Sequence, residues 1–448
     1  MQVCKFGGTS MADHRTWMRV ADLLRTMDKP VVVVSATART TRELVRAAEL
    51  AAQDEMGQGE MGQALTMIRG IRERHIEIVR SFAGEAGSLR EGIASRETTS
   101  SNETNSPSPT EPAGESPGRP ANTINIDPAI QYIESIAAGL RKDLDLVAST
   151  GTLTADILDR VAGSGELLSS RLFAECARWI GLPAQFADAR TIIKTDAVFG
   201  AANPDEARSA DTINPIKTML ADGQIPVIGG YIGEAPDGRP TTLGFEGSDV
   251  TATFLGGLLG ADSVTIWTDV DGIYSCDPRV VPDARRLERL TFAQAEKMAS
   301  CGAKVLHPNT LKPVSGRGIP VWVRNLFAPE RGGTLISGSL TGKFTDGEAS
   351  RGASSLGASS RGTSSGHRSA PAALAFREEV RVDGNTRSPG LRISVMGLSS
   401  KRWDRVRDHA ARVAEDFQYS EADEFLSAWI PEDESENRIQ ILYHLTCS

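Results

Sequence analysis

Near its start the sequence reads Val3-Cys4-Lys5-Phe6-Gly7-Gly8-Thr9-Ser10. This stretch carries one lysine from a short apolar strand into a pair of glycines followed by two hydroxyl side chains. Glycines let backbone N–H groups approach an anion closely, and the hydroxyls can cap the helix that we expect to follow. A helix N-terminus also favours an anion. The pattern predicts a phosphate-binding strand–turn–helix unit, with an ordinary βα unit as the alternative.

Strand and helix patterns alternate from this stretch onward. The run Val31-Val32-Val33-Val34 is continuously apolar and β-branched, which is typical of a strand buried on both faces of a parallel sheet. We expect helices over residues 13–26, 128–146, 154–162, 166–180, 248–259 and 291–300, and further strands over 184–186, 225–228, 264–268 and 321–323. This alternation predicts an α/β fold, a three-layer αβα sandwich with a mainly parallel sheet.

Two segments interrupt the periodic pattern. Residues 83–127 are rich in Ser, Thr, Glu, Pro and Gly, and such a segment cannot bury enough apolar surface to order itself. Residues 338–371 are rich in Gly and Ser, as is typical of a flexible linker. We therefore expect one large domain over 1–337, with a disordered insertion, and a small α+β module over 372–448. In that module we expect strands at 391–395, 425–430 and 438–445 and a helix at 401–416.

The composition argues against several classes of protein. A net charge of -9 over 448 residues does not suit a nucleic-acid surface, which is normally basic. The 5 cysteines are scattered without CxxC spacing, so neither a disulfide framework nor a zinc cluster is indicated. No apolar run has the length of a membrane span, and no secretory apolar segment stands at the start. We therefore expect a soluble, cytoplasmic protein without nucleic-acid or membrane partners.

A second glycine-bearing loop, Gly244-Phe245-Glu246-Gly247-Ser248-Asp249, precedes an apolar helical pattern. Ser248 is a suitable N-cap, and Asp249 falls in the first turn, where the helix dipole favours a carboxylate. Stabilising the helix in this way would be a purely structural role for Asp249. A carboxylate there can also accept hydrogen bonds from phosphate-binding lysines and keep them aimed. We favour the second interpretation because the neighbouring motifs point to the same chemistry.

Two further motifs carry groups suited to a nucleotide. Residues 267–279 place Thr268 and Asp269 at the carboxyl end of an apolar strand, the edge where ligands bind in open α/β sheets. The Asp-Gly and Asp-Pro pairs in this motif are also ordinary turn formers. In residues 302–308, Lys304 stands between small and apolar residues. A phosphate would satisfy a lysine buried there, although its side chain can also extend to solvent.

These groups suit phosphoryl transfer, because its transition state spreads negative charge over oxygen atoms and is stabilised by positioned cations. Other catalytic motifs are missing from the sequence. There is no GxxxxGK[ST], no GxGxxG with a suitable acidic residue downstream, no HExxH and no paired histidines. Dehydrogenase and metalloprotease functions therefore have no support.

Taken in order, the motifs resemble those of aspartokinases, members of the amino-acid kinase superfamily, over residues 1–337 apart from the insertion. The resemblance rests on residues 5–10, 34–36, 165–170, 241–244, 247–249, 268–274, 277–279 and 302–308. It implies the amino-acid kinase fold and phosphoryl transfer from ATP, with Mg²⁺, to the β-carboxylate of L-aspartate. The product, 4-phospho-L-aspartate, leads to lysine, threonine and methionine. The resemblance also implies a homodimer.

The same resemblance implies roles for individual residues. Lys5 would stabilise charge on the transferred phosphoryl group, and Asp249 would organise the active-site lysines. The nucleotide would contact Lys5, Phe6, Gly7, Gly8, Thr268, Asp269, Tyr274, Arg279, Lys304 and Val305. Aspartate would contact Ser35, Thr41, Glu166, Phe245, Glu246, Gly247 and Ser248, with Glu166 holding its ammonium group. Mg²⁺ would bind mainly nucleotide oxygens and water, so we expect no dedicated protein metal site.

The substrate loop departs from the family pattern. Family members usually carry Gly-Arg-Gly-Gly-Ser-Asp there, and the arginine pairs with a substrate carboxylate. This chain has Phe245 and Glu246 at the corresponding positions. Losing such a pair costs on the order of a few kcal/mol unless another cation replaces it. The candidate replacements, in or beside the other substrate motifs, are Arg39, Arg42 and Arg171.

The C-terminal part also departs from the family, whose members usually carry two ACT domains. Residues 372–448 suffice for a single ACT-like module at most, so we expect weak or no feedback inhibition by lysine or threonine. Two other functions stay open: a nucleotide-binding homologue that has lost aspartate recognition, and a kinase for glutamate or acetylglutamate. The retained Lys5 and Asp249 favour an active enzyme, and residues 268–272 and 302–308 favour aspartate.

Overall fold

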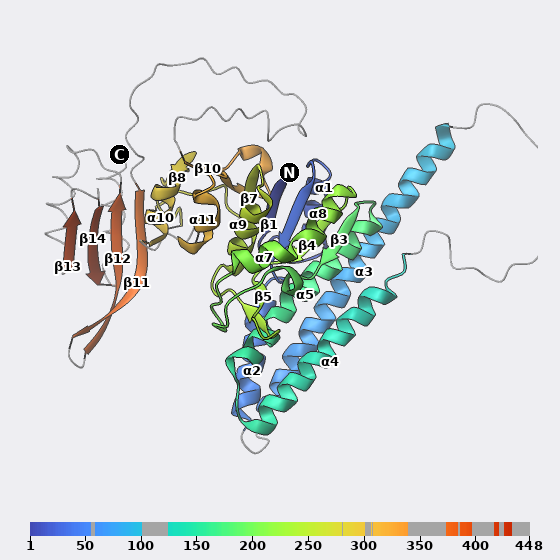
Figure 1. The fold of residues 1–448 in the computed structure, drawn as a ribbon, viewed down its shortest axis with the longest axis horizontal. Helices are drawn as coiled ribbons and strands as arrows, with labels where there is room; N and C mark the ends of the chain where they lie inside the picture. The colour runs from blue at the N-terminus through green and yellow to red at the C-terminus, as the bar shows by residue number, and fades with distance from the viewer. Residues whose placement is uncertain are drawn as a thin grey trace, which may run out of the picture. The chain divides into compact units, whose positions relative to one another are not determined.

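A computed structural model of the chain places most of its residues in two compact units (Figure 1). It describes residues 1–54, 59–100, 124–279, 281–300, 306 and 308–338, and four strands between residues 373 and 431. The units are Met1–Leu259 and Gly260–Ser448. The division falls inside the range 1–337, which the sequence predicts to be one domain, and that assignment stays a prediction.

Two short strands of the first unit, β5 (Ile232–Glu234) and β6 (Pro240–Thr242), pair antiparallel, and its other four described strands form a parallel sheet. They are β1 (Gln2–Phe6), β2 (Pro30–Val34), β3 (Ala184–Ala187) and β4 (Ile225–Gly229), in the order β3-β4-β2-β1. The register pairs Val3 with Val31, and Val32 with Val227. Every residue of β2 is buried. Its unbroken valine run therefore belongs to a central strand that is covered on both faces.

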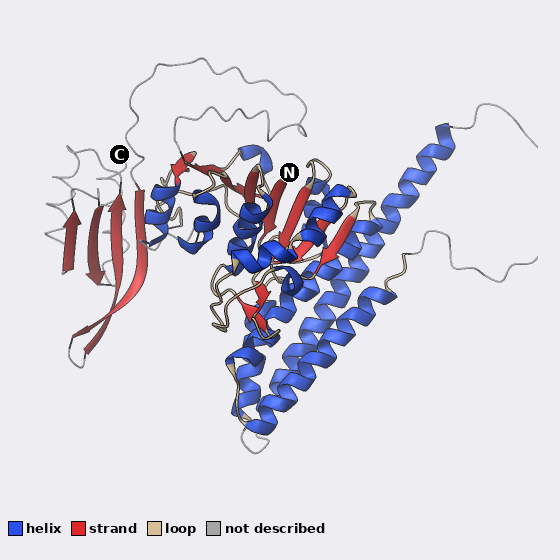
Figure 2. Ribbon diagram, viewed as in Figure 1, coloured by secondary structure: helices blue, strands red, loops and turns tan. Residues whose placement is uncertain are grey.

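Helices cover both sides of this sheet (Figure 2). They are α1 (His14–Leu24), α2 (Thr40–Gln53), α3 (Glu60–Ser100), α4 (Asp127–Thr150), α5 (Ala155–Trp179), α6 (Ala189–Ile192), α7 (Glu206–Thr212), α8 (Asn214–Ala221) and α9 (Gly247–Leu259). The chain runs from β1 through α1 to β2, and from β2 through α2–α5 to β3, so both connections move toward the β3 edge of the sheet. It then runs from β3 through α8 to β4, in the opposite direction. Because parallel connections are right-handed, α1, α2 and α5 lie on one face and α8 lies on the other. The predicted α/β fold is confirmed.

The turn after β1 differs from its prediction. The Asp13 side chain caps α1 by accepting a hydrogen bond from the Thr16 N–H at 2.8 Å, and the Thr16 hydroxyl accepts one from the Asp13 N–H at 3.0 Å. This is a capping box. The expectation that the hydroxyls of Thr9 and Ser10 cap this helix is wrong. Ser10 is fully buried, and its hydroxyl has no hydrogen-bond partner in the described part of the chain.

The predicted break between residues 162 and 166 is also wrong, because α5 runs from Ala155 to Trp179 without interruption. A Cβ at Gly163 would lie 2.7 Å from Ile232 Cγ2, and one at Gly165 would lie 2.9 Å from Ala36 Cβ. These glycines therefore allow neighbouring segments to approach the helix closely. That close packing offsets their low helix propensity.

Helix α3 extends further than the sequence predicted. It continues to Ser100, and α4 begins at Asp127, so the expectation of disorder from residue 83 is wrong for residues 83–100. Ile78, Phe82 and Ala86 are buried at four-residue intervals, and this spacing is the helical signal that was overlooked. Residues 101–123 lie outside the described residues.

The second unit continues the α/β pattern, with four described strands up to residue 338. They are β7 (Ser263–Thr268), β8 (Arg289–Thr291), β9 (Val321–Asn325) and β10 (Thr334–Ser337), accompanied by α10 (Phe292–Ser300), α11 (Pro308–Ser315) and the short 3₁₀ helix η1 (Pro329–Arg331). Strands β7 and β9 are parallel, β9 and β10 antiparallel, and β10 and β8 parallel. This part of the sheet is therefore mixed.

The described strands beyond residue 372 form an antiparallel sheet in the order β11-β12-β14-β13. They are β11 (Ala373–Asp383), β12 (Thr386–Met396), β13 (Asp416–Ser420) and β14 (Phe425–Pro431). The strands predicted at 391–395 and 425–430 are confirmed. Strand β11 was overlooked, although Leu374, Phe376, Val380 and Val382 follow the alternation of a strand. Residues 401–415 and the predicted strand 438–445 lie outside the described residues, so the ACT-like assignment stays a prediction.

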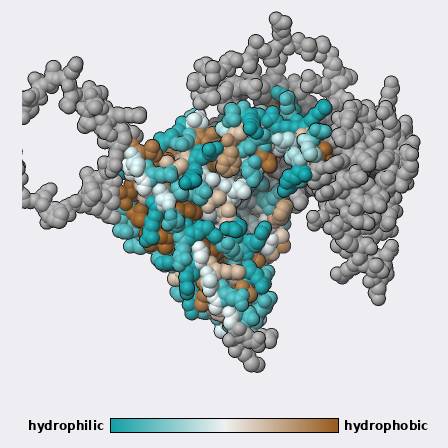
Figure 3. Space-filling view, turned by 180° about the vertical axis from the view of Figure 1, so that it is seen from behind, coloured by the Kyte–Doolittle hydropathy of each residue, from teal (hydrophilic) through white to brown (hydrophobic). Residues whose placement is uncertain are grey.

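The surface is mainly hydrophilic on the face seen from behind. There, smaller groups of hydrophobic residues lie between hydrophilic ones (Figure 3). Among the described helices, none is both long and apolar enough to cross a bilayer.

Candidate active site

The centre of the candidate site is an ion pair between the first strand of the sheet and the helix that packs on it. Lys5 Nζ, on β1, lies 2.6 Å from Asp249 Oδ1, in the first turn of α9, and the two side chains are only 12% and 9% exposed. The contact lacks the alignment of a hydrogen bond. Water screens a pair at such depth weakly, so the charges hold one another in place. The two residues predicted to be catalytic are therefore brought together.

A third ionisable group, Glu166, projects from the middle of α5. It is 3% exposed, and its Oε1 accepts a hydrogen bond from the Ala36 N–H at 3.2 Å. Burial raises its pKa to about 8, against the lowering effects of that hydrogen bond and of the Lys5 charge. Its other oxygen, Oε2, has no hydrogen-bond partner among the described residues. A buried carboxyl group with a free oxygen is suited to receive a cationic ligand group.

The loop between β2 and α2 joins these groups to the glycine pair. The Ser35 N–H donates to the Phe6 carbonyl at 3.0 Å, so the loop continues beside the end of β1. A Cβ at Gly8 would lie 3.4 Å from the Ala36 carbonyl oxygen, which places the glycine backbone against the same loop. The predicted phosphate turn and the predicted substrate loop are thus neighbours. Phe6 is fully buried, so only its backbone is available to a ligand.

A buried histidine of α3, which the sequence analysis did not single out, contacts the same loop. His75 Nε2 lies 3.1 Å from the Thr37 hydroxyl, and its Nδ1 lies 2.7 Å from the Ile71 carbonyl oxygen. Nδ1 therefore carries the proton, and Nε2 accepts from Thr37. Burial lowers the pKa of His75 to about 4, so the ring is neutral near pH 7 and this contact is intact.

A second residue that the sequence analysis overlooked is Asp159, whose carboxyl group joins α5 to the segments that carry Gly200 and Thr242. It is 2% exposed and accepts three hydrogen bonds: from the Gly200 N–H at 2.9 Å, the Thr242 N–H at 2.8 Å and the Thr242 hydroxyl at 2.7 Å. Burial raises its pKa, although these hydrogen bonds oppose the shift. Asp159 lies two helical turns before Glu166 on α5. That spacing puts both on one helix face, which is the sequence signal that could have revealed it.

Close packing at the start of α9 needs glycine at two points, one in α9 itself and one directly after β4. A Cβ at Gly247 would lie 2.8 Å from Tyr231 Cδ2, and a Cβ at Gly230 would lie 2.6 Å from Ser248 Cβ. Helix α9 begins at Gly247, so Ser248 lies inside its first turn and the prediction that Ser248 is the N-cap is wrong. Phe245 is 79% exposed at the rim of the loop before α9.

Tyr231 is a further residue of this region that the sequence did not indicate. Its φ is 67°, an unusual value for a residue other than glycine. Its N–H donates to the Thr251 hydroxyl at 3.0 Å, and its carbonyl oxygen accepts from the Leu243 N–H at 2.8 Å. These contacts to α9 and to its preceding loop hold the strained residue in place.

The second unit contains the other predicted nucleotide residues. Thr268 ends β7, and its hydroxyl donates to Asp269 Oδ1 at 3.1 Å. Arg279 is 79% exposed and pairs with Asp277 at 2.6 Å. Asn325 ends the neighbouring parallel strand β9 and donates to Asp271 Oδ1 at 2.6 Å, a position at the ligand edge that the sequence analysis overlooked.

The other predicted residues are placed as follows. Thr41 lies in the first turn of α2, half-buried. Glu246 has a left-handed backbone, with a φ of 55°. Tyr274 forms an isolated bridge with Arg286. Lys304 and Val305 lie outside the described residues.

The structure also bears on the three arginines named as replacements for the missing cation. Arg171 stacks between the rings of Tyr132 and Phe186, 5.5 Å from each centroid, and so is engaged on the side of α5 away from Glu166. Arg39 and Arg42 are exposed, at the start of α2. Two of the three candidates therefore remain.

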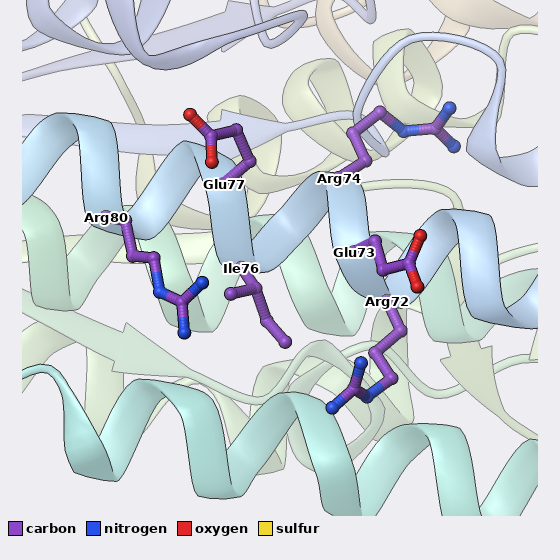
Figure 4. A pocket seen from close by; sticks show the side chains of 6 residues that line it. All are labelled: Arg72, Glu73, Arg74, Ile76, Glu77 and Arg80. Atoms are coloured by element: carbon purple, nitrogen blue, oxygen red, sulfur yellow. The ribbon is translucent and has the colours of Figure 1, made fainter.

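A surface pocket along α3 lies apart from these motifs (Figure 4). It is lined by Arg72, Glu73, Arg74, Ile76, Glu77 and Arg80. Arg72 pairs with Glu134 at 2.5 Å, and Arg74 pairs with Glu43. Two of the three arginines that line the pocket are thus paired with carboxylates of the protein. Among the described residues, no group of three or more His, Cys, Asp or Glu side chains is arranged to hold a metal ion.

Comparisons with known proteins point to one family. The model of the amino acid kinase family matches residues 1–325. The chain is 35% identical over 336 residues to lysine-sensitive aspartokinase 3 of Escherichia coli (strain K12), covering 75% of this chain and 63% of the relative. It is 31% identical over 342 residues to chloroplastic aspartokinase 1 of Arabidopsis thaliana, covering 75% and 52%. The match thus spans roughly half to two thirds of these relatives.

Solved structures show the same fold. The crystal structure of E. coli aspartokinase III in complex with aspartate and ADP, in the R-state, superposes with a TM-score of 0.73 at 24% sequence identity, covering 99% of both chains. The T-state structure of that protein with lysine and aspartate superposes with a TM-score of 0.69. At this level of identity the similarity concerns the fold.

Proposed function

This chain belongs to the amino acid kinase family, and we propose that it is an aspartate kinase, which transfers a phosphoryl group from ATP to the β-carboxylate of L-aspartate. The observation that carries the proposal is the buried Lys5–Asp249 pair, at 2.6 Å, beside the Glu166 carboxyl group with its free oxygen. The named relatives are aspartokinases, and the solved structure of one of them holds aspartate and ADP.

The reaction forms one oxygen–phosphorus bond and breaks another. A carboxylate oxygen of aspartate attacks the γ-phosphorus in line, and the bond to the ADP oxygen breaks as ADP leaves. The attacking group is already an anion near pH 7, so no general base is required. The protein's task is to position the reactants and to stabilise the negative charge that spreads over the phosphoryl oxygens.

Lys5 is the residue of this chain placed for that stabilisation. Asp249 fixes the direction of its ammonium group, and the Gly7–Gly8 backbone beside Lys5 leaves room for phosphate oxygens. Bound Mg²⁺ would neutralise phosphate charge through nucleotide oxygens and water. In the second unit, Thr268, Asp269, Tyr274 and Arg279, together with Lys304 and Val305, would serve the nucleotide.

Glu166 is assigned to the ammonium group of aspartate. Its pKa of about 8 means that it is largely protonated in the free protein near pH 7. An incoming ammonium group would displace that proton and pair with the carboxylate, so that burial of two opposite charges occurs together. Ser35, Thr41 and the loop from Phe245 to Ser248 would enclose the remainder of the substrate. We also propose a homodimer in the cytoplasm that serves lysine, threonine and methionine synthesis.

One assay tests this function. The purified protein is incubated with ATP, Mg²⁺ and hydroxylamine, and aspartate, glutamate or acetylglutamate is supplied in turn. Hydroxamate formation with aspartate alone is the expected result. Formation only with glutamate or acetylglutamate would assign another substrate, and no product with any acid would refute an active enzyme.

A second candidate function, a nucleotide-binding protein without aspartate kinase activity, is favoured by one observation. Phe245 and Glu246 stand where the family carries a cation, and Phe245 is 79% exposed. Calorimetric titration distinguishes the two functions. Binding of ATP without any binding of aspartate would support the second candidate.

A further inference from the structure

The loop before α9 supplies no cation for a substrate carboxylate. Between its glycines it carries a phenyl ring, at Phe245, which is exposed, and a carboxylate, at Glu246, which is half-buried. Lys5 is already paired with Asp249 at 2.6 Å. If aspartate binds here, one of its two carboxylates therefore needs a partner from another segment.

Arg39 occupies a backbone conformation that favours glycine. Its φ is 69° and its ψ is -12°, in the left-handed region, which costs free energy for any residue with a Cβ. The strain does not serve the capping of α2, because the Arg39 side chain makes no cap hydrogen bond. Strained residues of this kind are held by the surrounding structure, and they cluster at active sites and ligand-binding loops.

The Arg39 guanidinium is also unengaged. It is exposed, and within the described part of the chain it makes no hydrogen bond, ion pair or ring contact. Arg74, the nearby cation from α3, pairs instead with Glu43, and Arg171 stacks between two rings. Arg39 is thus available to a ligand.

The loop that carries Arg39 touches both halves of the site. The Ala36 N–H donates to Glu166, and a Cβ at Gly8 would lie 3.9 Å from the Ala38 Cα. Arg39 directly follows Ala38, so its backbone lies within three residues of both contacts. We propose that Arg39 pairs with a carboxylate of the substrate, in the role that the family gives to an arginine at the position of Phe245. This inference rests on the proposed aspartate kinase function.

Arg42 provides the matched control. It is also exposed, and it lies less than one helical turn further along the chain. The buried residues of α2 include Thr40, Leu44 and Ala47, and a residue two positions after Thr40 points to the opposite side of a helix. Arg42 therefore faces away from the core and has the same charge without the same position.

The test compares Arg39→Gly, Arg42→Ala and the double variant Arg39→Gly/Phe245→Arg in steady-state kinetics. We expect Arg39→Gly to raise KM for aspartate at least tenfold and to leave KM for ATP within twofold. Its thermal midpoint should stay equal or rise, because glycine relieves the left-handed strain. The control is Arg42→Ala, because alanine preserves the helix better than glycine does. It should leave both KM values within twofold.

The double variant should recover most of the lost aspartate affinity, because it restores a cation at the family position. Three results would overturn the inference: an unchanged KM for aspartate in Arg39→Gly, an equal rise in the Arg42 variant, or a rise in both KM values together with a lower thermal midpoint. Absence of aspartate kinase activity in the wild-type protein would instead refute the proposed function. The two failures are therefore distinguishable.

Discussion

The buried half of the candidate site and its exposed rim differ in how their residues are held. Lys5, Asp249 and Glu166 lie on a strand and two helices and are almost fully buried. Arg39 and Phe245 lie on loops, exposed to solvent. Close packing and low dielectric make any change in the buried half expensive. The rim can vary, and we propose that acceptor recognition has been rearranged there while the buried half serves phosphoryl transfer.

The largest expected effect tests the buried half directly. Lys5→Met should lower kcat by about 10³-fold, since one stabilising group at the transferred charge is typically worth that much. The rate of ADP release measures it. Lys217→Met, an exposed lysine on α8, is the control and should retain full activity. A loss of less than tenfold in Lys5→Met would mean that this half is not the chemical centre.

The next effect concerns the hydrogen bonds of Asp159. Asp159→Asn keeps the shape of the side chain but cannot accept all three hydrogen bonds from Gly200 and Thr242. The free energy of unfolding should fall by about 1–3 kcal/mol, and KM for aspartate should rise. Urea denaturation and kinetics measure the two changes. Asp145→Asn, on the exposed side of α4, removes only a surface ion pair with Arg141, so as the control it should lower the free energy of unfolding by no more than about 0.5 kcal/mol and leave KM unchanged.

A pair of glycine variants sharpens the contrast between close packing and open surface. Gly165→Ala places a methyl group 2.9 Å from Ala36 Cβ and should lower the free energy of unfolding by about 1–3 kcal/mol. Gly139→Ala, in α4 with nothing within 4 Å, should raise it by about 0.5–1 kcal/mol. Urea denaturation compares them. Equal effects would show that helix propensity, rather than the approach of Ala36, decides the outcome at Gly165.

A smaller effect follows from Glu166, whose pKa is raised to about 8. Aspartate binding requires its ionised form, so KM for aspartate should fall as pH rises from 6.5 to 8, by up to about tenfold per pH unit. The folded protein holds this proton more tightly than the unfolded chain. The free energy of unfolding should therefore decrease as pH rises from 4.5 toward 8.

Steady-state kinetics and urea denaturation across that pH range check both trends. Glu166→Gln cannot titrate, so its stability should lose this dependence. A wild-type KM that stays constant from pH 6.5 to 8 would contradict the assignment of Glu166 to the ammonium group.

Much of the buried half was predictable from local sequence. The valine run of β2, the strand that bears Lys5 and the helix that bears Asp249 were all predicted, because each depends on periodicity and on neighbours in the chain. Gly163 and Gly165 misled the prediction. They resemble a helix break, and only the approach of Ile232 and Ala36 shows why glycine stands there.

The rim and its supports could not be derived in the same way. Asp159 meets Gly200 and Thr242, and His75 meets Thr37, across long separations in the chain. Patterns within one segment carry no information on such contacts. The left-handed backbone of Arg39 could not be predicted either, because arginine normally adopts right-handed or extended backbone angles.

The residue types that handle phosphate and the class of fold thus followed from the order of residues alone, because glycine, lysine and valine act through their own chemistry and their immediate neighbours. Only the folded chain decided that Glu166 holds a proton near pH 7 and that Arg39 is left exposed. Both depend on burial and on contacts between distant segments, and packing creates these when it removes water from some groups and leaves others exposed.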